Sequence, residues 1–480
     1  MGNPKERIVA MPISRRYALR GLAAAGLGAL VAACAQAPAA PAPTTVPSKA
    51  TAPAQPTVAA APNTPATPIA QTAAASKGAA TIRYWSWLNS KDEKNVRAKA
   101  QGEMLDLFTK ANPSVNLLQE VIPWQTLHQQ LLQAAAAKKA PDVSKQLDQY
   151  LVVLTGAGAL TDLDPFVKGW SADRRDDYVY SWDDTTFNGK KYAFRDAIQL
   201  KSLLYYRTDL YAEAGQPAPP KTLDEFTSII GKVTKGPISG YMDGLSKNTG
   251  GGWYPSWWWS FGEDVVDLKT GKATFQGNAG QKIYQWLQDL VYKYKVSPVG
   301  EATMDSNAVL QLFVGGTLAT TFTNSAKWST WKTAKALAGH LATASMPNFA
   351  NDPSKPAPVD TTGGWTLVMP VGAQQELAWK LLDTLQSNPA ELIDAKVGNE
   401  LPTRKSTLKD AYFDTDQAKL MKTWLTMLAQ NHHPSTTLKI TKIAVLNDVL
   451  AEAGQQIVTN KADVKTTLAA AAQKYDNASA

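Results

Sequence analysis

The alternation of strands and helices early in the folded part of this chain limits most strongly what it can fold into. Apolar and polar side chains alternate as in strands, or recur at helical spacing, in successive short segments. The predicted order is a strand at 81–87, a helix at 94–110, a strand at 115–122, a helix starting at Pro123 and a short strand at Val143. This order is typical of a parallel sheet covered by helices, so we predict an α/β fold.

Further along the chain we predict a strand, a polar connecting segment and a second strand. Residues 192–194 and 203–206 have strand-like patterns, and the segment 195–201 between them is polar. Thr222 and Glu225 form a capping box that predicts the start of the next helix.

The length of 480 residues exceeds what one ordinary core accommodates, so two compact lobes are the simplest prediction. Internal repeats of 20 to 50 residues are not evident, which argues against a solenoid or a propeller. Later helices are predicted at 279–294, 305–313, 417–428, 440–456 and 464–475, and later strands at 317–322 and 363–370.

The N-terminus has the features of an export signal. Arg15 and Arg16 form a twin-arginine pattern, and the apolar run 21–33 is too short to span a membrane stably. That run ends in Val-Ala-Ala-Cys, which resembles a bacterial lipobox with Cys34 as the lipidated residue. We therefore predict a signal at 1–33 and a lipid anchor on Cys34.

Composition supports this division of the chain. Without the first 33 residues the chain has 44 basic and 40 acidic residues, a formal charge of +4, which does not indicate nucleic-acid binding. Cys34 is the only cysteine, so internal disulfides and thiolate metal sites are excluded. Residues 34–80 are mostly Ala, Pro and Thr, and we predict a disordered tether there.

Several motifs, taken in order, resemble one family. They include "W-W" after the first strand, "PW--L--QL--A-A-K-APDV", "GAL-DLDP", "L-YY-R-T-DL" and "PPKT-DEF". The chain from 81 to 480 is thereby similar to sugar-type extracellular solute-binding proteins, the periplasmic-binding-protein-like lipoproteins that feed bacterial ABC importers.

The resemblance implies a two-lobe, type II periplasmic-binding-protein-like fold with three interlobe crossings. It implies a hinge at 195–202, a second crossing at Met346 to Asn348 and a third junction at 401–406. The expected N-terminal lobe is 81–196 plus 349–405, and the expected C-terminal lobe is 197–348 plus 406–480.

Candidate ligand contacts are rings and polar groups near strand ends and crossings, because open parallel sheets bind ligands beyond the carboxyl ends of their strands. Indole rings stack on the apolar faces of sugars, and polar side chains bond their hydroxyls. Most of these rings are at least as plausibly part of the core, but Trp87, Trp257 and Trp365 are favoured as ligand contacts because their positions resemble the family's ligand-facing sites. Trp328 stands near a family Gly-Pro-Trp, one residue out of spacing, and Arg195 predicts either an acidic ligand or a pair with Asp196. The candidates are Trp87, Asn89, Trp124, Gln146, Asp148, Gln149, Arg195, Asp196, Gln199, Trp253, Tyr254, Trp257, Asn324, Trp328, Trp365 and Arg404.

The sequence supports an enzymatic function less well. The sequence motifs of penicillin-binding enzymes occur singly and in the wrong order along the chain, and no H-E-x-x-H or G-x-S-x-G motif is present. His432 and His433 are expected in an exposed loop before Pro434, not at a metal. We expect neither a cofactor nor a metal.

The sequence therefore predicts a monomeric, lipid-anchored receptor on the extracytoplasmic face of the membrane. It would close on a carbohydrate and deliver it to an ABC permease. A surface-tethered glycan-processing enzyme is the alternative, since forty-one acids make some suitably spaced carboxylate pair unavoidable.

Overall fold

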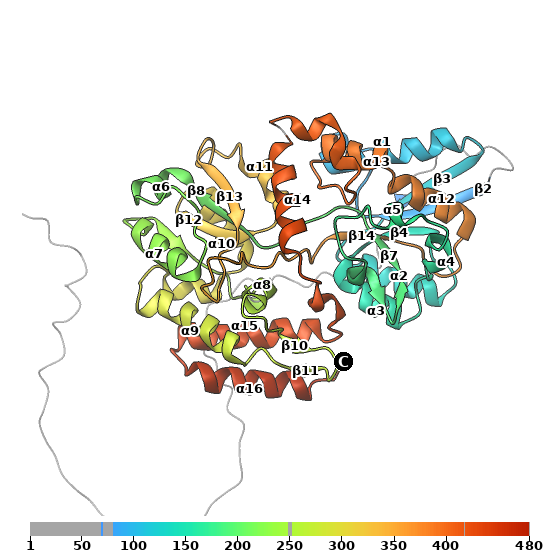
Figure 1. The fold of residues 1–480 in the computed structure, drawn as a ribbon. Coiled ribbons are helices and arrows are strands. Elements are labelled where there is room, and N and C mark those ends of the chain that lie inside the picture. Colours follow the sequence, from blue (N-terminus) through green and yellow to red (C-terminus); the bar gives the residue numbers. More distant parts are fainter. Residues whose placement is uncertain (1–68, 71–79, 248–251, 417, 480) are drawn as a thin grey trace, which may run out of the picture. The chain divides into compact units, whose positions relative to one another are not determined.

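The first sheet combines early strands with one that returns late in the chain. The computed structural model describes residues 69–70, 80–247, 252–416 and 418–479. In this sheet the strands lie in the order β1-β3-β2-β4-β14-β7 (Figure 1). β2 runs parallel to β3 and β4, as predicted, whereas β14 runs antiparallel to β4 and β7. The bounds are β1 Ile69–Ala70, β2 Ala80–Ser86, β3 Val115–Val121, β4 Val143–Leu147, β7 Ala193–Arg195 and β14 Trp365–Val368.

Helices bury both faces of this sheet. Tyr84 of β2 packs in one cluster with Phe108 of α1, and its neighbour Trp85 packs in another with Leu127 and Leu131 of α2. Adjacent strand residues point to opposite faces, so β2 contributes to two separate cores. The helices here are α1 Val96–Ala111, α2 Leu127–Ala136, α3 Leu151–Gly156, α4 Asp164–Val167, α5 Ala172–Arg175, α12 Gln375–Leu385 and α13 Asn388–Ile393.

The second sheet has the strand order β13-β8-β12-β9. β8 (Leu203–Arg207) runs antiparallel to β12 (Leu318–Thr323) and β13 (Leu341–Ser345), whereas β9 (Ser239–Tyr241) is parallel to β12. Two small hairpins accompany the sheets, β5 Thr186–Phe187 with β6 Lys190–Lys191 and β10 Val266–Asp267 with β11 Lys272–Ala273.

Most of the remaining helices lie where they were predicted, whereas those at Pro255–Trp259 and Trp328–Trp331 were not predicted. α7 begins after Thr222, whose hydroxyl accepts a hydrogen bond from the backbone N–H of Glu225 (3.2 Å), and the Glu225 carboxylate accepts one from Lys221 N–H (2.6 Å). The capping box is therefore present, with Lys221 as the reciprocal donor. The bounds are α6 Thr208–Glu213, α7 Leu223–Val233, α8 Pro255–Trp259, α9 Asn278–Tyr292, α10 Ser306–Val314, α11 Trp328–Trp331, α14 Lys419–Asn431, α15 Ile443–Thr459 and α16 Val464–Asn477.

Two stretches of chain join the sheets, 196–202 from β7 to β8 and the second crossing, 346–364, from β13 to β14, and the third crossing at 401–406 leads from α13 towards α14. The first crossing donates from its Ile198 N–H to the carbonyl of Leu401 (3.0 Å) in the third. Its Lys201 N–H donates to the carbonyl of Asp360 (2.8 Å) in the second. The three crossings therefore form one hydrogen-bonded unit between the sheets.

Three residues of the predicted tether, Ile69, Ala70 and Ala80, are described, and they lie in strands. Ile69 and Ala70 pair antiparallel with Val121 and Glu120 as β1, and Ala80 begins β2. The disordered tether over 34–80 otherwise stays a prediction. The twin-arginine pattern and Cys34 lie outside the described residues. Within the described part of the chain, every helix is too short or too polar to cross a membrane.

Candidate functional site

Two tryptophans meet at the edge of the first sheet where its parallel strands end. Trp87 follows β2, and Trp365 is the first residue of β14, which runs antiparallel and therefore starts at the same edge. Their rings stack with centroids 5.1 Å apart and planes 27° apart. Trp87 is half-buried and Trp365 is 7% exposed. We call Trp87 and Trp365 the platform, and it lies at the edge where open α/β sheets bind ligands.

The backbone that leads into Trp365 is fixed by one buried carboxylate. Asp148, just after β4, accepts hydrogen bonds from the N–H groups of Gly363 (3.0 Å) and Gly364 (3.1 Å). Gly363 has φ +80°, in the left-handed region that favours glycine, and a Cβ on Gly364 would lie 3.2 Å from the Arg195 guanidinium. Both glycines are therefore needed for the turn that places Trp365.

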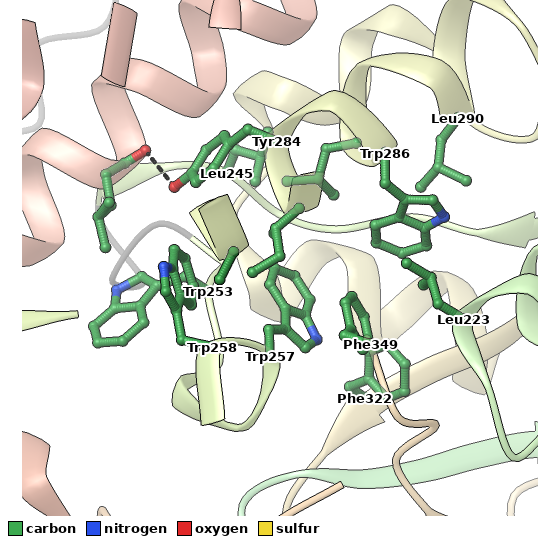
Figure 2. Packing of buried hydrophobic residues seen from close by; sticks show 14 of the residues in the cluster. Leu223, Leu245, Trp253, Trp257, Trp258, Tyr284, Trp286, Leu290, Phe322 and Phe349 are labelled. Carbon is green, nitrogen blue, oxygen red and sulfur yellow. Dashed lines mark hydrogen bonds between the residues drawn. The ribbon is translucent and has the colours of Figure 1, made fainter. Parts of the chain in front are cut away.

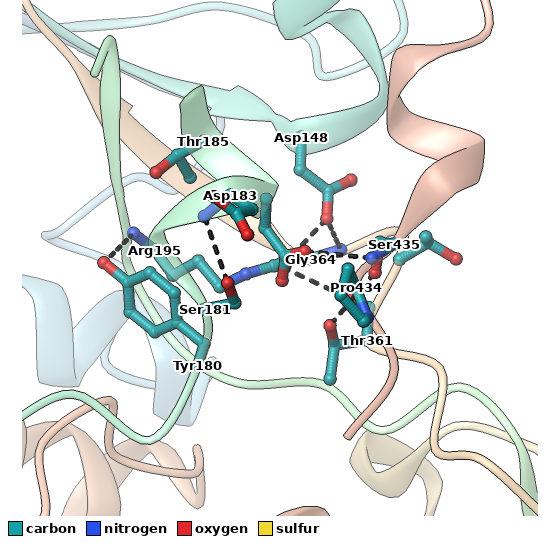
Figure 3. A network of polar contacts seen from close by, with 12 residues as sticks. Asp148, Tyr180, Ser181, Asp183, Thr185, Arg195, Thr361, Gly364, Pro434 and Ser435 are labelled. Carbon is teal, nitrogen blue, oxygen red and sulfur yellow. Dashed lines mark hydrogen bonds and ion pairs between the residues drawn. The ribbon is translucent and has the colours of Figure 1, made fainter. Parts of the chain in front are cut away.

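Arg195 links this turn to two further segments (Figure 3). Its fully buried guanidinium lies 3.0 Å from Asp148 and 3.0 Å from Asp184, and it donates to the carbonyl of Thr361 (3.1 Å). Asp184 also accepts a hydrogen bond from Ser435 N–H (3.0 Å). We call Asp148, Asp184, Arg195, Thr361 and Ser435 the arginine network. It ties the ends of β4 and β7 to the second crossing and to the segment after α14.

The two acids of the arginine network respond differently to burial. Burial works to raise the pKa of Asp184, but the Arg195 charge, His432 and the Ser435 N–H lower it to about 2. For Asp148, burial outweighs Arg195 and the glycine N–H groups, and the pKa is raised. Asp184 is thus the firmly ionised partner of Arg195.

Both predicted roles of Arg195 are corrected by this geometry. With no exposed surface it cannot meet an acidic ligand in this conformation, and its partners are Asp148 and Asp184. Asp196 instead pairs with Lys145 (2.6 Å). The charges that the sequence placed near a ligand are therefore paired inside the protein.

The tryptophan cluster of the second sheet is part of a hydrophobic core (Figure 2). Trp257 is fully buried and stacks on Phe349, with centroids 5.0 Å apart. Trp258 is also fully buried and donates from its indole N–H to the carbonyl of Phe275 (3.2 Å). Trp253 donates to Asn447 (3.0 Å). The structure does not bring Trp257 to a surface.

The other candidates are spread over the molecule, and their ligand contacts stay predictions. The Tyr254 hydroxyl donates to the carbonyl of Phe322 (2.9 Å), Trp328 meets Trp424 edge-on, and Arg404 pairs with Asp177 (2.8 Å). Trp124 (47% exposed), Asn89 and Gln149 are exposed, Tyr254, Asn324, Trp328 and Arg404 are half-buried, and Gln146, Gln199 and Trp253 are buried.

Sequence reasoning missed Asp184, Thr361 and Ser435. They come from three separate segments, and no spacing pattern connects them to Arg195. The histidine pair follows α14 in a loop, as predicted, but both side chains are half-buried and not exposed. The His432 side chain is 15% exposed and lies 3.5 Å from Asp184, and the His433 ring stacks on Trp259 at 4.2 Å. Across the described ranges, no three His, Cys, Asp or Glu side chains are grouped to hold a metal.

Residues 89–392 match the sequence model of the bacterial extracellular solute-binding protein family. The chain belongs to this family. A putative binding protein of Brucella abortus (strain 2308) is 26% identical to this solute-binding protein over 192 residues, 39% of this chain and 46% of the relative. The match thus spans about half the length of that curated relative. The alpha-glucosides-binding periplasmic protein AglE of Rhizobium meliloti (strain 1021) is 30% identical over 143 residues, 28% of this chain and 30% of AglE.

Solved structures show the same fold. The sugar-binding protein MalE from the phytopathogen Xanthomonas citri superposes with a TM-score of 0.67 at 21% identity, covering 82% of this chain and 96% of that one. The predicted two-lobe α/β fold of type II periplasmic binding proteins is thereby confirmed.

Proposed function

We propose that this solute-binding protein captures a carbohydrate between its two lobes and delivers it to an ABC permease. The platform carries the proposal, because it sets two stacked indoles at the ligand-binding edge of the first sheet. The printed names of AglE and of MalE, an alpha-glucoside binder and a sugar-binding protein, support a carbohydrate as ligand. The lobe boundaries stay as predicted, 81–196 plus 349–405 and 197–348 plus 406–480.

Stacking gives an affinity of the right size. Covering about 50 Å² of apolar sugar surface on a ring contributes roughly 1 kcal/mol. A few such contacts with hydrogen bonds reach about −8 kcal/mol, a micromolar Kd. Arg195, Lys145 and Arg97, which lie near the platform, each pair with a buried carboxylate, which favours a neutral ligand over a phosphorylated one.

Closure would convert binding into a signal for the permease. Ligand contacts from both lobes stabilise the closed form, and the bonded crossings form the pivot. Chemistry on the ligand is not part of this proposal. Cys34 would carry the lipid that holds the receptor on the extracytoplasmic face, and replacing Cys34 by Ala would release the protein from membranes.

A thermal-shift and calorimetry screen of the purified protein tests the binding. Maltose, maltotriose and glycerol 3-phosphate serve as probes. We expect a neutral saccharide to raise the Tm and to bind with a micromolar Kd, and glycerol 3-phosphate to do neither. Binding of no saccharide would refute the proposal, and release of cleaved products from a bound saccharide would favour the glycan-processing enzyme.

A further inference from the structure

Arg97 of α1 lies between the platform and the third crossing. Its guanidinium carbon is 5.1 Å from the centroid of the Trp87 ring, a cation–π distance. The Nε atom of the same guanidinium pairs with the carboxylate of Glu400. The Arg97 side chain is 24% exposed and that of Glu400 is 6% exposed, so the pair is largely shielded from solvent. One planar group thus contacts a ring of the platform and a buried carboxylate.

Glu400 stands where two crossings meet. The next residue, Leu401, accepts the hydrogen bond from Ile198 that joins the third crossing to the first (3.0 Å). The N–H of Glu400 itself donates to the carbonyl of Asp394 (3.3 Å), in a π-helix spanning Asp394–Gly398. The carboxylate that Arg97 contacts is therefore fixed to the pivot.

The surroundings of the pair form a closed cluster of charges. Lys145 of β4 pairs with Asp196, the first residue of the first crossing, at 2.6 Å. These two side chains, with Asp394, Arg97 and Glu400, line a cavity of about 10 Å³. A space of this size holds at most one water, so the cluster is not a ligand site. Its ion pairs instead link the first sheet to the starts of two crossings.

We propose that Arg97 is a positioning residue that couples the Trp87 ring to the pivot through Glu400. A movement of the third crossing displaces Glu400, and the bound guanidinium carries that displacement to the ring. By thermodynamic reciprocity, ligand stacking on the platform biases the arrangement of the crossings. The coupling of the Trp87 ring to the third crossing is inferred from contacts in the structure. Only the expected effect of Arg97 on ligand affinity rests on the proposed function.

A double-variant comparison without ligand tests the link. Trp87 and Glu400 share no polar contact in the described structure, and Arg97 connects them. We expect the Tm loss of the W87L and E400Q double variant to be smaller than the sum of the single losses by about 1–3 °C. The R97K variant keeps the positive charge but lacks the planar guanidinium. In the R97K background, the Tm losses caused by W87L and E400Q should therefore be additive.

The second sheet offers a matched control. Arg207 at the end of β8 pairs with Asp209 of α6 (2.7 Å), beside an apolar cluster separate from the one that contains the platform rings. W87L combined with D209N should give additive Tm losses. Additive losses for W87L with E400Q, or an equal difference in the R97K background, would overturn the proposal.

Calorimetry with maltose and maltotriose tests the consequence for binding. We expect R97K to raise Kd by about 3- to 10-fold and R207K to change it less than about 2-fold. If the wild-type protein binds either sugar and R97K binds it equally well, the role in ligand binding is refuted. If the wild-type protein binds neither, the proposed function fails, while the Tm comparison still decides whether Arg97 couples ring and crossing.

Discussion

The platform and the tryptophan cluster of the second sheet are both rich in indole rings, yet they are built differently. Trp365 sits on a turn whose N–H groups are bonded by a buried carboxylate, at the edge of the first sheet where its parallel strands end. Trp257 and Trp258 are fully buried among apolar side chains. A dense run of rings in a sequence therefore marks a core at least as readily as a binding site, and the polar support of the backbone distinguishes the two.

The buried acids of the two regions differ in the same way. Asp184 beside the platform has Arg195 as its partner, and its pKa is lowered to about 2. Asp243, beneath the second sheet, accepts a hydrogen bond from Tyr241 (3.1 Å), and burial raises its pKa to about 7. The first region holds Asp184 ionised by pairing, and the second holds Asp243, a carboxyl group that burial favours as neutral.

The largest effect is expected from breaking the arginine network. Arg195→Leu leaves Asp148 and Asp184 buried without their cation, and we expect a loss of about 5 kcal/mol of unfolding free energy in urea titrations. Lys235→Leu, in a pair with both side chains more than half exposed, should cost less than about 1 kcal/mol. Equal losses would show that the network does not hold the first region together.

A slightly smaller loss is expected in the tryptophan cluster. Trp257→Ala removes a fully buried ring and should cost about 4 kcal/mol. Trp124→Ala, at a residue 47% exposed, should stay within about 0.5 kcal/mol of wild type. A stable Trp257→Ala protein with weakened saccharide binding would instead make this ring a ligand contact.

The acids predict opposite pH responses, worth about 4 kcal/mol for Asp243 and about 2 kcal/mol for Asp184. The folded-state pKa of Asp243 lies above its unfolded value, so its contribution is present in acid and lost as pH rises from 4 through 7. Asp243→Asn should therefore reduce the loss of stability over that range. Asp184 has a depressed pKa, so its contribution is present above pH 4 and lost as pH falls towards 2.

Denaturation midpoints of both asparagine variants between pH 2 and 8 check these signs. Asp184→Asn should reduce only the loss of stability as pH falls from 4 to 2. Asp243→Asn should reduce only the loss of stability as pH rises from 4 to 7. Glu301, whose carboxylate accepts from Asp243 N–H (3.4 Å), has a pKa raised by burial and adds to the second effect. A variant that reduces the loss of stability in the other acid's pH range would contradict these pKa directions.

Periodicity and motif order were enough to predict the parallel part of the first sheet and most helices. They could not predict that β14 inserts beside β4, because that pairing joins residues more than 200 positions apart. Trp87 and Trp365 were candidates for their places after and within strands, which is local information. The contacts of the arginine network were not predictable. The β5–β6 hairpin brings Asp184 to Arg195, whereas Thr361 and Ser435 come from segments that follow the first crossing.

Saccharide affinity of platform variants tests the central claim most directly. Trp87→Leu and Trp365→Leu keep apolar volume and remove the flat ring, and Trp379→Phe, whose ring packs on Phe166, serves as the control. With the tightest-binding saccharide of the screen, calorimetry should give about 10-fold higher Kd for each platform variant and an unchanged Kd for the control. Kd values within about 2-fold of wild type for both folded platform variants would contradict the account.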